Sequence, residues 1–224
     1  MTVTLESTAV LPDAIYDSLR RGIVDQSHAP GSMITESLVA SLFGVARPTA
    51  RLAIERLVGE GLLRRESHRA ARVPELDRAD ITDIFDNRAI IETEAASALA
   101  RLGSVPLPAV RAHDKLLHDV ETNAPFAAND TAFHRFLVEG QPSPRLVRLH
   151  SLLMGEVELC IGQIQADHLR DPETVAGEHQ AILDAIVARD PAEAATLTRE
   201  HIHRSRDALL AQWDDRNAKD LPHG

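Results

Sequence analysis

The chain has few aromatic residues, a single cysteine and no long hydrophobic run, and each shortage excludes a class of protein. Aromatic residues make up 3% of the 224 residues, so the core must be aliphatic, which favours helices. With Cys160 alone, the chain can form neither an internal disulfide nor a cysteine-based zinc site. No apolar stretch approaches the roughly 20 residues of a membrane-spanning helix. The N-terminus lacks the basic and apolar regions of a signal peptide, so we expect a cytoplasmic protein without membrane contact.

The charge is unevenly distributed along the sequence. The net charge is −10, yet residues 1–75 carry nine basic and nine acidic side chains. The whole acidic excess therefore lies in residues 76–224. A neutral N-terminal part with clustered arginines can bind phosphates, whereas the acidic remainder would face away from nucleic acid.

Residues 35–63 predict two short helices joined by a tight turn, after a first helix over about residues 12–25. Thr35 is a suitable N-cap for the first of the two, and Gly44 is suited to end it in a left-handed conformation. We expect its buried stripe to consist of Leu38, Leu42 and Val45.

The second of these helices begins near Arg47, where Pro48 suits the first turn. Its buried face is expected to consist of Ala50, Ala53, Ile54 and Leu57. The opposite face carries Arg47, Thr49, Arg51 and Glu55. Arginine can pair bidentately with guanine, so this pattern is typical of a helix-turn-helix recognition helix, although an ordinary helical hairpin also fits it. Residues 64–73 predict a two-stranded wing with its tip near His68 and Arg69.

Residues 76–224 predict an antiparallel bundle of six helices, separated from the N-terminal domain (1–75) by a short linker. Asp or Ser followed directly by Pro is a strong helix start, and it occurs at Ser143, Asp171 and Asp190. The predicted helices cover approximately residues 77–102, 108–121, 125–139, 143–168, 171–189 and 190–215.

Three histidines and one aspartate fall on the apolar faces of three of these helices. Asp130 and His134 are four residues apart, which places them one helical turn apart on one face. His179 and His201 each lie on a separate apolar stripe. Together the four side chains predict a divalent metal site suited to Zn, Ni, Mn or Fe(II), with open positions for water or a chelating ligand. The alternative is that each histidine is separately a satisfied core residue.

The N-terminal segment resembles the winged helix of GntR-type bacterial transcription regulators. The residues that carry the resemblance are Pro30-Gly31-Ser32, Gly44-Val45-Ala46-Arg47-Pro48-Thr49-Ala50-Arg51 and Leu57 to Leu62. Ala46 and Leu52 replace a serine and a glutamate that are usual in that family, and Ala70 stands near a usual wing glycine. Residues 77–215 are similar to the FCD ligand-binding domain of the FadR subfamily, whose Asp-x-x-x-His, His, His motif matches Asp130, His134, His179 and His201.

The resemblance implies a homodimeric, metabolite-responsive regulator that binds an inverted-repeat operator in double-stranded DNA. It implies base contacts from Arg47 and Arg51 with help from Thr49, and wing contacts from His68 and Arg69. It also implies a small carboxylate effector at the metal, held by Arg88, unless Arg88 instead forms a salt bridge with Asp86 or Glu92. We expect repression that the effector relieves, which is the commoner behaviour in the family, and activation is the alternative.

Two other hypotheses remain open at this point. The His/Asp site could belong to a metal-dependent hydrolase, in which an open position on the metal activates water. Against that reading, the sequence shows no further general base beside the predicted ligands. Alternatively, the metal could be purely structural in a regulator that binds its effector elsewhere.

Overall fold

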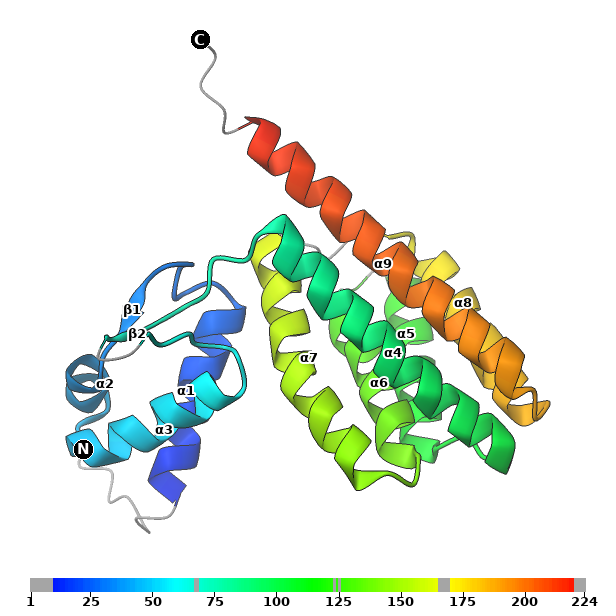
Figure 1. The fold of residues 1–224 in the computed structure, drawn as a ribbon, viewed down its shortest axis with the longest axis horizontal. Coiled ribbons are helices and arrows are strands. Elements are labelled where there is room, and N and C mark those ends of the chain that lie inside the picture. The colour runs from blue at the N-terminus through cyan, green and yellow to red at the C-terminus, as the bar shows by residue number, and fades with distance from the viewer. Residues whose placement is uncertain (1–9, 67–68, 123, 125, 165–169, 220–224) are drawn as a thin grey trace. The chain divides into compact units, whose positions relative to one another are not determined.

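The computed structural model describes residues 10–66, 69–122, 124, 126–164 and 170–219. The chain divides into two compact units, Met1–Leu76 and Asp77–Gly224 (Figure 1). The first contains a helix-turn-helix and a very small sheet, and the second is built from helices. The predicted fold class, a mainly α protein with a winged helix-turn-helix followed by a helical bundle, is confirmed. Within the described ranges, no helix combines the length and the apolar character needed to cross a bilayer.

The first unit contains the helices α1 (Val10–Val24), α2 (Glu36–Phe43) and α3 (Arg47–Gly59). α3 packs against both α1 and α2 and presents the predicted buried face to them. The core between α1 and α3 is aliphatic and consists of Ile15, Leu19, Ile23, Ala50, Ala53, Ile54 and Leu57.

The two ends of α2 agree with the predicted capping residues. The hydroxyl of Thr35 accepts a hydrogen bond from the backbone N–H of Leu38 at 3.1 Å. Gly44 adopts φ 65° and ψ 34°, and its backbone N–H donates to the carbonyl of Ala40. This left-handed cap turns the chain into α3, which begins at Arg47.

The predicted buried stripe of α2 is wrong. Leu38 and Leu42 are 51% and 65% exposed, whereas the neighbouring Val39 is 1% exposed. Val45 is half-buried and lies beyond the end of the helix. A helix of eight residues makes little more than two turns, so an error of one residue in phase rotates the stripe by about 100°.

The small sheet also differs from the predicted wing. Strand β1 (Met33–Ile34) pairs antiparallel with β2 (Ala71–Arg72). On the other side of β2, Arg64 forms an isolated antiparallel bridge with Arg72. The segment before α2 therefore takes part in the wing, which the sequence pattern did not indicate because two residues are too few to show an alternation. The predicted wing tip at His68 lies outside the described residues.

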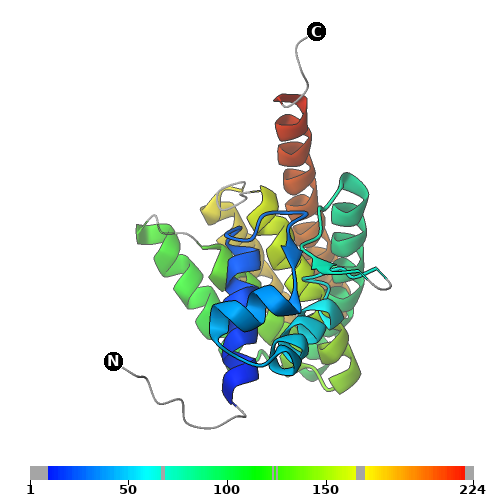
Figure 2. The same cartoon turned by 90° about the vertical axis from the view of Figure 1, so that its left-hand side faces the viewer.

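The second unit contains six helices in its described residues, in agreement with the predicted number. They are α4 (Arg78–Leu102), α5 (Leu107–Thr122), α6 (Ala127–Gly140), α7 (Pro144–Ile164), α8 (Pro172–Val187) and α9 (Pro191–Lys219). α4 and α9 lie side by side, and the C-terminal turns of α9 extend past the other helices of this unit (Figures 1 and 2). The predicted end of the fourth bundle helix, near His168, falls outside the described residues.

Side-chain caps set where several of these helices begin. Asp77 and Asp80 form a reciprocal capping box at the start of α4. Asp171 accepts from the backbone N–H of Thr174 at 2.8 Å, and Asp190 accepts from the N–H groups of Ala192 and Glu193. The Asp-Pro starts that the sequence predicted are thus true N-caps.

Candidate metal centre and DNA-reading face

Four side chains from three helices converge in the interior of the second unit. α6 carries Asp130 and His134 one turn apart, α8 carries His179, and α9 carries His201. The three histidines are fully buried, and the side chain of Asp130 is 19% exposed. Their candidate ligand atoms all lie within 4.8 Å of one another. The structure therefore brings together the four residues that the sequence predicted as ligands.

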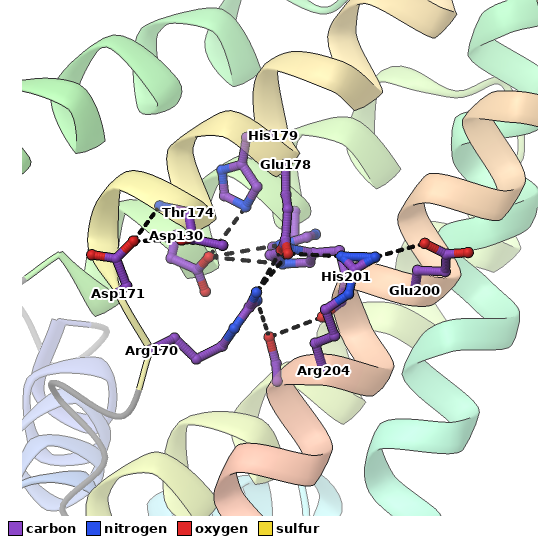
Figure 3. Close-up of polar contacts among 11 residues, drawn as sticks. Asp130, Arg170, Asp171, Thr174, Glu178, His179, Glu200, His201 and Arg204 are labelled. Carbon is purple, nitrogen blue, oxygen red and sulfur yellow. Dashed lines mark hydrogen bonds and ion pairs between the residues drawn. The ribbon is translucent and has the colours of Figure 1, made fainter.

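The Nε2 atoms of the three histidines surround one carboxylate oxygen. Asp130 Oδ1 lies 3.2 Å from His179 Nε2, 3.9 Å from His134 Nε2 and 4.0 Å from His201 Nε2. The Nε2 atoms of His134 and His201 are 2.9 Å apart. Asp130, His179 and His201 are turned towards one another in Figure 3. Such a cluster can serve as one set of donors directed at a single cation.

A buried carboxylate of α4 stands behind the first of these histidines. Glu92 Oε2 lies 2.6 Å from His134 Nδ1, and Glu92 Oε1 lies 2.9 Å from His150 Nε2 on α7. Arg88 Nε donates to the same Oε1 at 2.7 Å, and both partners of this ion pair are 3% exposed. Of the two salt-bridge partners weighed for Arg88, the structure thus shows Glu92, in a buried rather than a surface setting.

A second carboxylate, that of Glu178 on α8, contacts Nδ1 of His201 as Glu92 contacts Nδ1 of His134. Its Oε2 lies 2.7 Å from His201 Nδ1. It also accepts from Arg170 Nη2 through both oxygens and from Arg204 Nη1, each at 2.7 Å (Figure 3). A carboxylate behind a histidine fixes the orientation and tautomer of the ring, which is the usual outer layer of a metal site.

The environment favours the protonation states that bind metal. Burial lowers the pKa of His179 to about 3 and that of His201 to about 4, so both rings are neutral at pH 7. Burial alone would raise the pKa of Asp130, but the surrounding imidazoles hold it well below the ordinary value. Burial likewise opposes ionisation of Glu178, yet its contacts with His201 and Arg170 lower its pKa to about 2.

The donors fit a divalent metal ion. Nδ1 of His201 forms a hydrogen bond with Glu178, whereas Nδ1 of His134 lies 2.6 Å from Glu92 Oε2 without hydrogen-bond geometry. The Nε2 atoms of these two rings face each other at 2.9 Å. Neither ring nitrogen of buried His179 has a hydrogen bond, although its Nε2 lies near Asp130. A cation held by Asp130 and by one nitrogen of each histidine would satisfy the converging donors together. Three imidazoles and one carboxylate suit Zn, Ni, Mn or Fe(II) alike.

A pocket adjoins the cluster and includes about 510 Å³ of empty space, part of it open to solvent. Asp130 and Arg88 line it, and so do Arg170 and Ser205. Arg88 Nη2 is buried without a hydrogen-bond partner, so one guanidinium donor of this pocket-lining residue is unsatisfied. The pocket thus places a predicted carboxylate-binding arginine beside a predicted metal ligand.

Several residues of this centre were not predicted from the sequence. From the sequence, Glu92 is expected only as a salt-bridge partner of Arg88, and His150 fits a solvated helix face as well as a pocket. No sequence pattern marks Glu178 or Arg170. The available signal was a charged or imidazole side chain on an inward-facing helix stripe, which is costly unless paired. His113, for which the sequence offered no supporting pattern, is buried with its ring 6.0 Å from that of His179.

The predicted DNA-reading residues lie at the start of α3 and in the wing. Arg47 is exposed, Thr49 is half-buried, and Arg51 is 60% exposed with its Nε 2.6 Å from Glu55 Oε1. Arg69 is exposed and pairs with Glu66 at 2.8 Å, whereas His68 is outside the described residues. Arg69 also lines a pocket in the wing together with three further arginines that no sequence pattern marks: Arg64, Arg65 and Arg72.

The chain combines a winged helix-turn-helix, which has an arginine-bearing recognition helix, with a helical domain. This combination is that of a DNA-binding transcription regulator, and the comparison with protein families agrees with it. Residues 11–73 match the bacterial regulatory proteins of the gntR family, and residues 83–204 match the FCD domain. The chain belongs to the GntR family of transcriptional regulators and carries a C-terminal FCD domain. Members of this family are regulators rather than enzymes, so the hydrolase hypothesis is set aside.

Known relatives are similar over most of their length. The chain is 28% identical over 201 residues to the HTH-type transcriptional repressor GlaR of Escherichia coli K12, covering 84% of this chain and 90% of GlaR. It is 25% identical to the repressor NanR of Enterobacter sp. 638, covering 91% and 85% of the two chains. Among solved structures, a GntR regulator from Rhodococcus sp. RHA1 superposes with a TM-score of 0.75 at 21% identity, covering 89% of this chain and 97% of that one. Escherichia coli McbR/YncC superposes with a TM-score of 0.73 at 18% identity, covering 95% and 100%.

Proposed function

We propose that this GntR regulator is a cytoplasmic, homodimeric repressor of the FadR subfamily. A small carboxylate, bound at a metal ion in the FCD domain, changes its affinity for operator DNA. The observation that carries this proposal is the convergence of Asp130, His134, His179 and His201 beside a pocket that contains the free Nη2 of Arg88. The metal would supply a Lewis-acidic anchor for one end of the effector.

Different residues of the chain orient the metal ligands and bind the effector. Glu92 and Glu178 orient the imidazoles of His134 and His201 through their Nδ1 atoms. Arg88 keeps its Nε on Glu92 and offers its Nη2 to the carboxylate. Arg88 and His134 both contact Glu92. A ligand that binds Arg88 can therefore shift Glu92 and, through it, the ring of His134. Such a ligand changes DNA affinity only to the extent that it binds one conformation of the protein better than another.

DNA reading is assigned to the start of α3 and to the wing. Arg47 and Arg51 contact guanines, Thr49 contacts a base or phosphate, and His68 and Arg69 track the neighbouring groove or backbone. In the free protein Arg51 pairs with Glu55 at an exposed position, an interaction that DNA can replace. A homodimer reads two half-sites of an inverted repeat, since the symmetry of the operator mirrors that of the protein.

The proposal is tested by thermal melting of the purified protein with small carboxylic acids, with and without a chelator, followed by operator release. The operator is first selected from random duplexes by the protein itself. We expect an acid that raises the melting temperature only when metal is present and that dissociates the protein from the selected duplex. Stabilisation that survives chelation would contradict the metal-dependent site. Stabilisation by metal alone, with no response to any acid, would favour a purely structural metal.

A further inference from the structure

We propose that the effector is a monocarboxylate with an apolar body, rather than a polyhydroxylated sugar acid or a dicarboxylate. This inference rests on the proposed function, because it assigns one end of the ligand to the metal and Arg88. It concerns the rest of the ligand, and it follows from the charges, the donors and the walls of the pocket beside Asp130.

The charges around the pocket leave room for one anionic group. Arg88 is paired with Glu92, and Arg170 is paired with Glu178 through both carboxylate oxygens. Arg204 shares Glu178 and is itself paired with Glu200. A divalent ion together with Asp130 then retains one positive charge, which a single carboxylate balances. A second carboxylate would be partly buried without an unpaired cation among the described lining residues, which costs free energy.

The polar donors of the pocket point to the same conclusion. Nη1 of Arg170 donates to Ser205 at 3.2 Å, and its Nη2 donates to Glu178. The hydroxyl of Ser205 in turn donates to the carbonyl of His201 at 3.1 Å. Among the described lining residues, Arg88 Nη2 is the one buried donor without a hydrogen bond. Among the residues that the structure describes, the hydrogen-bonding groups of Arg170 and Ser205 are therefore largely occupied within the protein, and Arg88 carries the unsatisfied donor nearest the metal ligands.

The remaining walls are apolar. Seven of the eleven described lining residues are hydrocarbon in character, and the larger ones come from five helices or their flanks: Phe85, Phe126, Ile161, Val175 and Leu209. Phe85, Val175 and Leu209 are themselves at least 95% buried, so these walls belong to the folded core. A chain of hydroxyl groups placed against them would lose its hydrogen bonds to water without replacement, whereas methylene groups would gain by burial.

A matched set of 2-hydroxy acids tests this inference on the metal-loaded protein. Each acid presents the same carboxylate and hydroxyl to the metal, so the acids differ only in their body. Isothermal titration is run with 2-hydroxypropanoate, 2-hydroxybutanoate, 2-hydroxypentanoate, gluconate and 2-hydroxyglutarate. We expect Kd to fall about fourfold for each added methylene, the equivalent of about 0.8 kcal/mol per buried CH₂. Gluconate and 2-hydroxyglutarate should bind at least about tenfold more weakly than 2-hydroxypentanoate.

Two variants on α8 test whether the gain in affinity per methylene comes from the apolar wall of the pocket. Val175→Thr adds a hydroxyl to the buried wall with almost no change of volume, and Val187→Thr makes the same change at a site that is 67% exposed. We expect Val175→Thr to reduce the gain per methylene to about twofold or less. Val187→Thr should leave the wild-type series unchanged.

The outcomes separate this inference from the function on which it rests. Equal or tighter binding of gluconate or 2-hydroxyglutarate would overturn the apolar, single-anion ligand while leaving a metal-dependent carboxylate site in place. An affinity that does not change along the methylene series would also overturn the inference. If none of the five acids bound to metal-loaded protein, both the inference and the proposed effector site would be refuted.

Discussion

Two buried histidines, His179 and His201, should make the free energy of unfolding of the metal-free protein depend on pH. His179 has a pKa of about 3 in the folded protein and an ordinary value of 6.5 in the unfolded chain. Between these values the unfolded chain binds a proton that the folded protein does not. The free energy of unfolding therefore has its full value well above pH 6.5 and falls as the pH is lowered through this range. From pH 7 to pH 5, one such histidine lowers the free energy of unfolding by about 2 kcal/mol.

His201 has a folded pKa of about 4 and adds a similar loss, so the pair contributes about 4 kcal/mol. The assay is urea unfolding with a chelator at pH 7 and pH 5, followed by the fluorescence of Trp213, the only tryptophan, which lies on α9. His179→Leu removes one titrating group and should reduce the pH-dependent loss by about 2 kcal/mol. His118→Leu changes a side chain that is 73% exposed and should leave the loss as in wild type. An equal loss in wild type and His179→Leu would refute the reasoning.

Three further predictions concern the metal support, the recognition helix and a helix cap. Glu178→Gln removes the anion behind His201 and should weaken metal binding about 10- to 100-fold by titration, whereas Glu200→Gln, on the far side of Arg204, should not. Arg51→Ala should abolish specific operator binding in a gel-shift assay while circular dichroism and the oligomeric state stay unchanged; unaltered operator affinity would contradict its assignment. Gly44→Ala should destabilise the first unit by about 1–2 kcal/mol, because φ is 65° and no neighbour lies within 4 Å of an added Cβ. The control is Gly59→Ala at the end of α3, where an added Cβ also has no neighbour within 4 Å and the backbone is helical. In thermal melting this variant should be neutral or stabilised. Equal destabilisation of both variants would exclude backbone conformation as the cause.

Much of the fold could be predicted from signals that lie close together in the sequence. Asp171 and Asp190, each followed by proline, mark helix starts because the cap and the first turn are determined by neighbouring residues. The stripes that contain His179 and His201 are several turns long, so their inward phase could be read from periodicity. The same method failed for α2, where the helix is too short to determine which of Leu38 and Val39 faces the core.

The partners of the buried charges could not be predicted in the same way. Glu92 contacts His134 across 42 positions of the sequence and His150 across 58, so the pairing depends on how α4, α6 and α7 pack. Glu178 precedes His179 in the chain, yet it supports His201 on α9 instead. Periodicity gives the direction of a side chain from its own helix, but it does not say which side chain of another helix it meets.

The four donors come from three helices, and this has a consequence for how the FCD domain opens. An ion held by Asp130, His134, His179 and His201 would be a crosslink that closes two chain loops, one from α6 to α8 and one from α8 to α9. Such a link reduces the entropy of the opened chain in the way a disulfide does, and it can be removed by a chelator. Backbone amides of α8 and α9 should therefore exchange with deuterium faster after chelation than those of α5, which provides no ligand. Metal supply would then set how rigidly the domain holds its effector pocket.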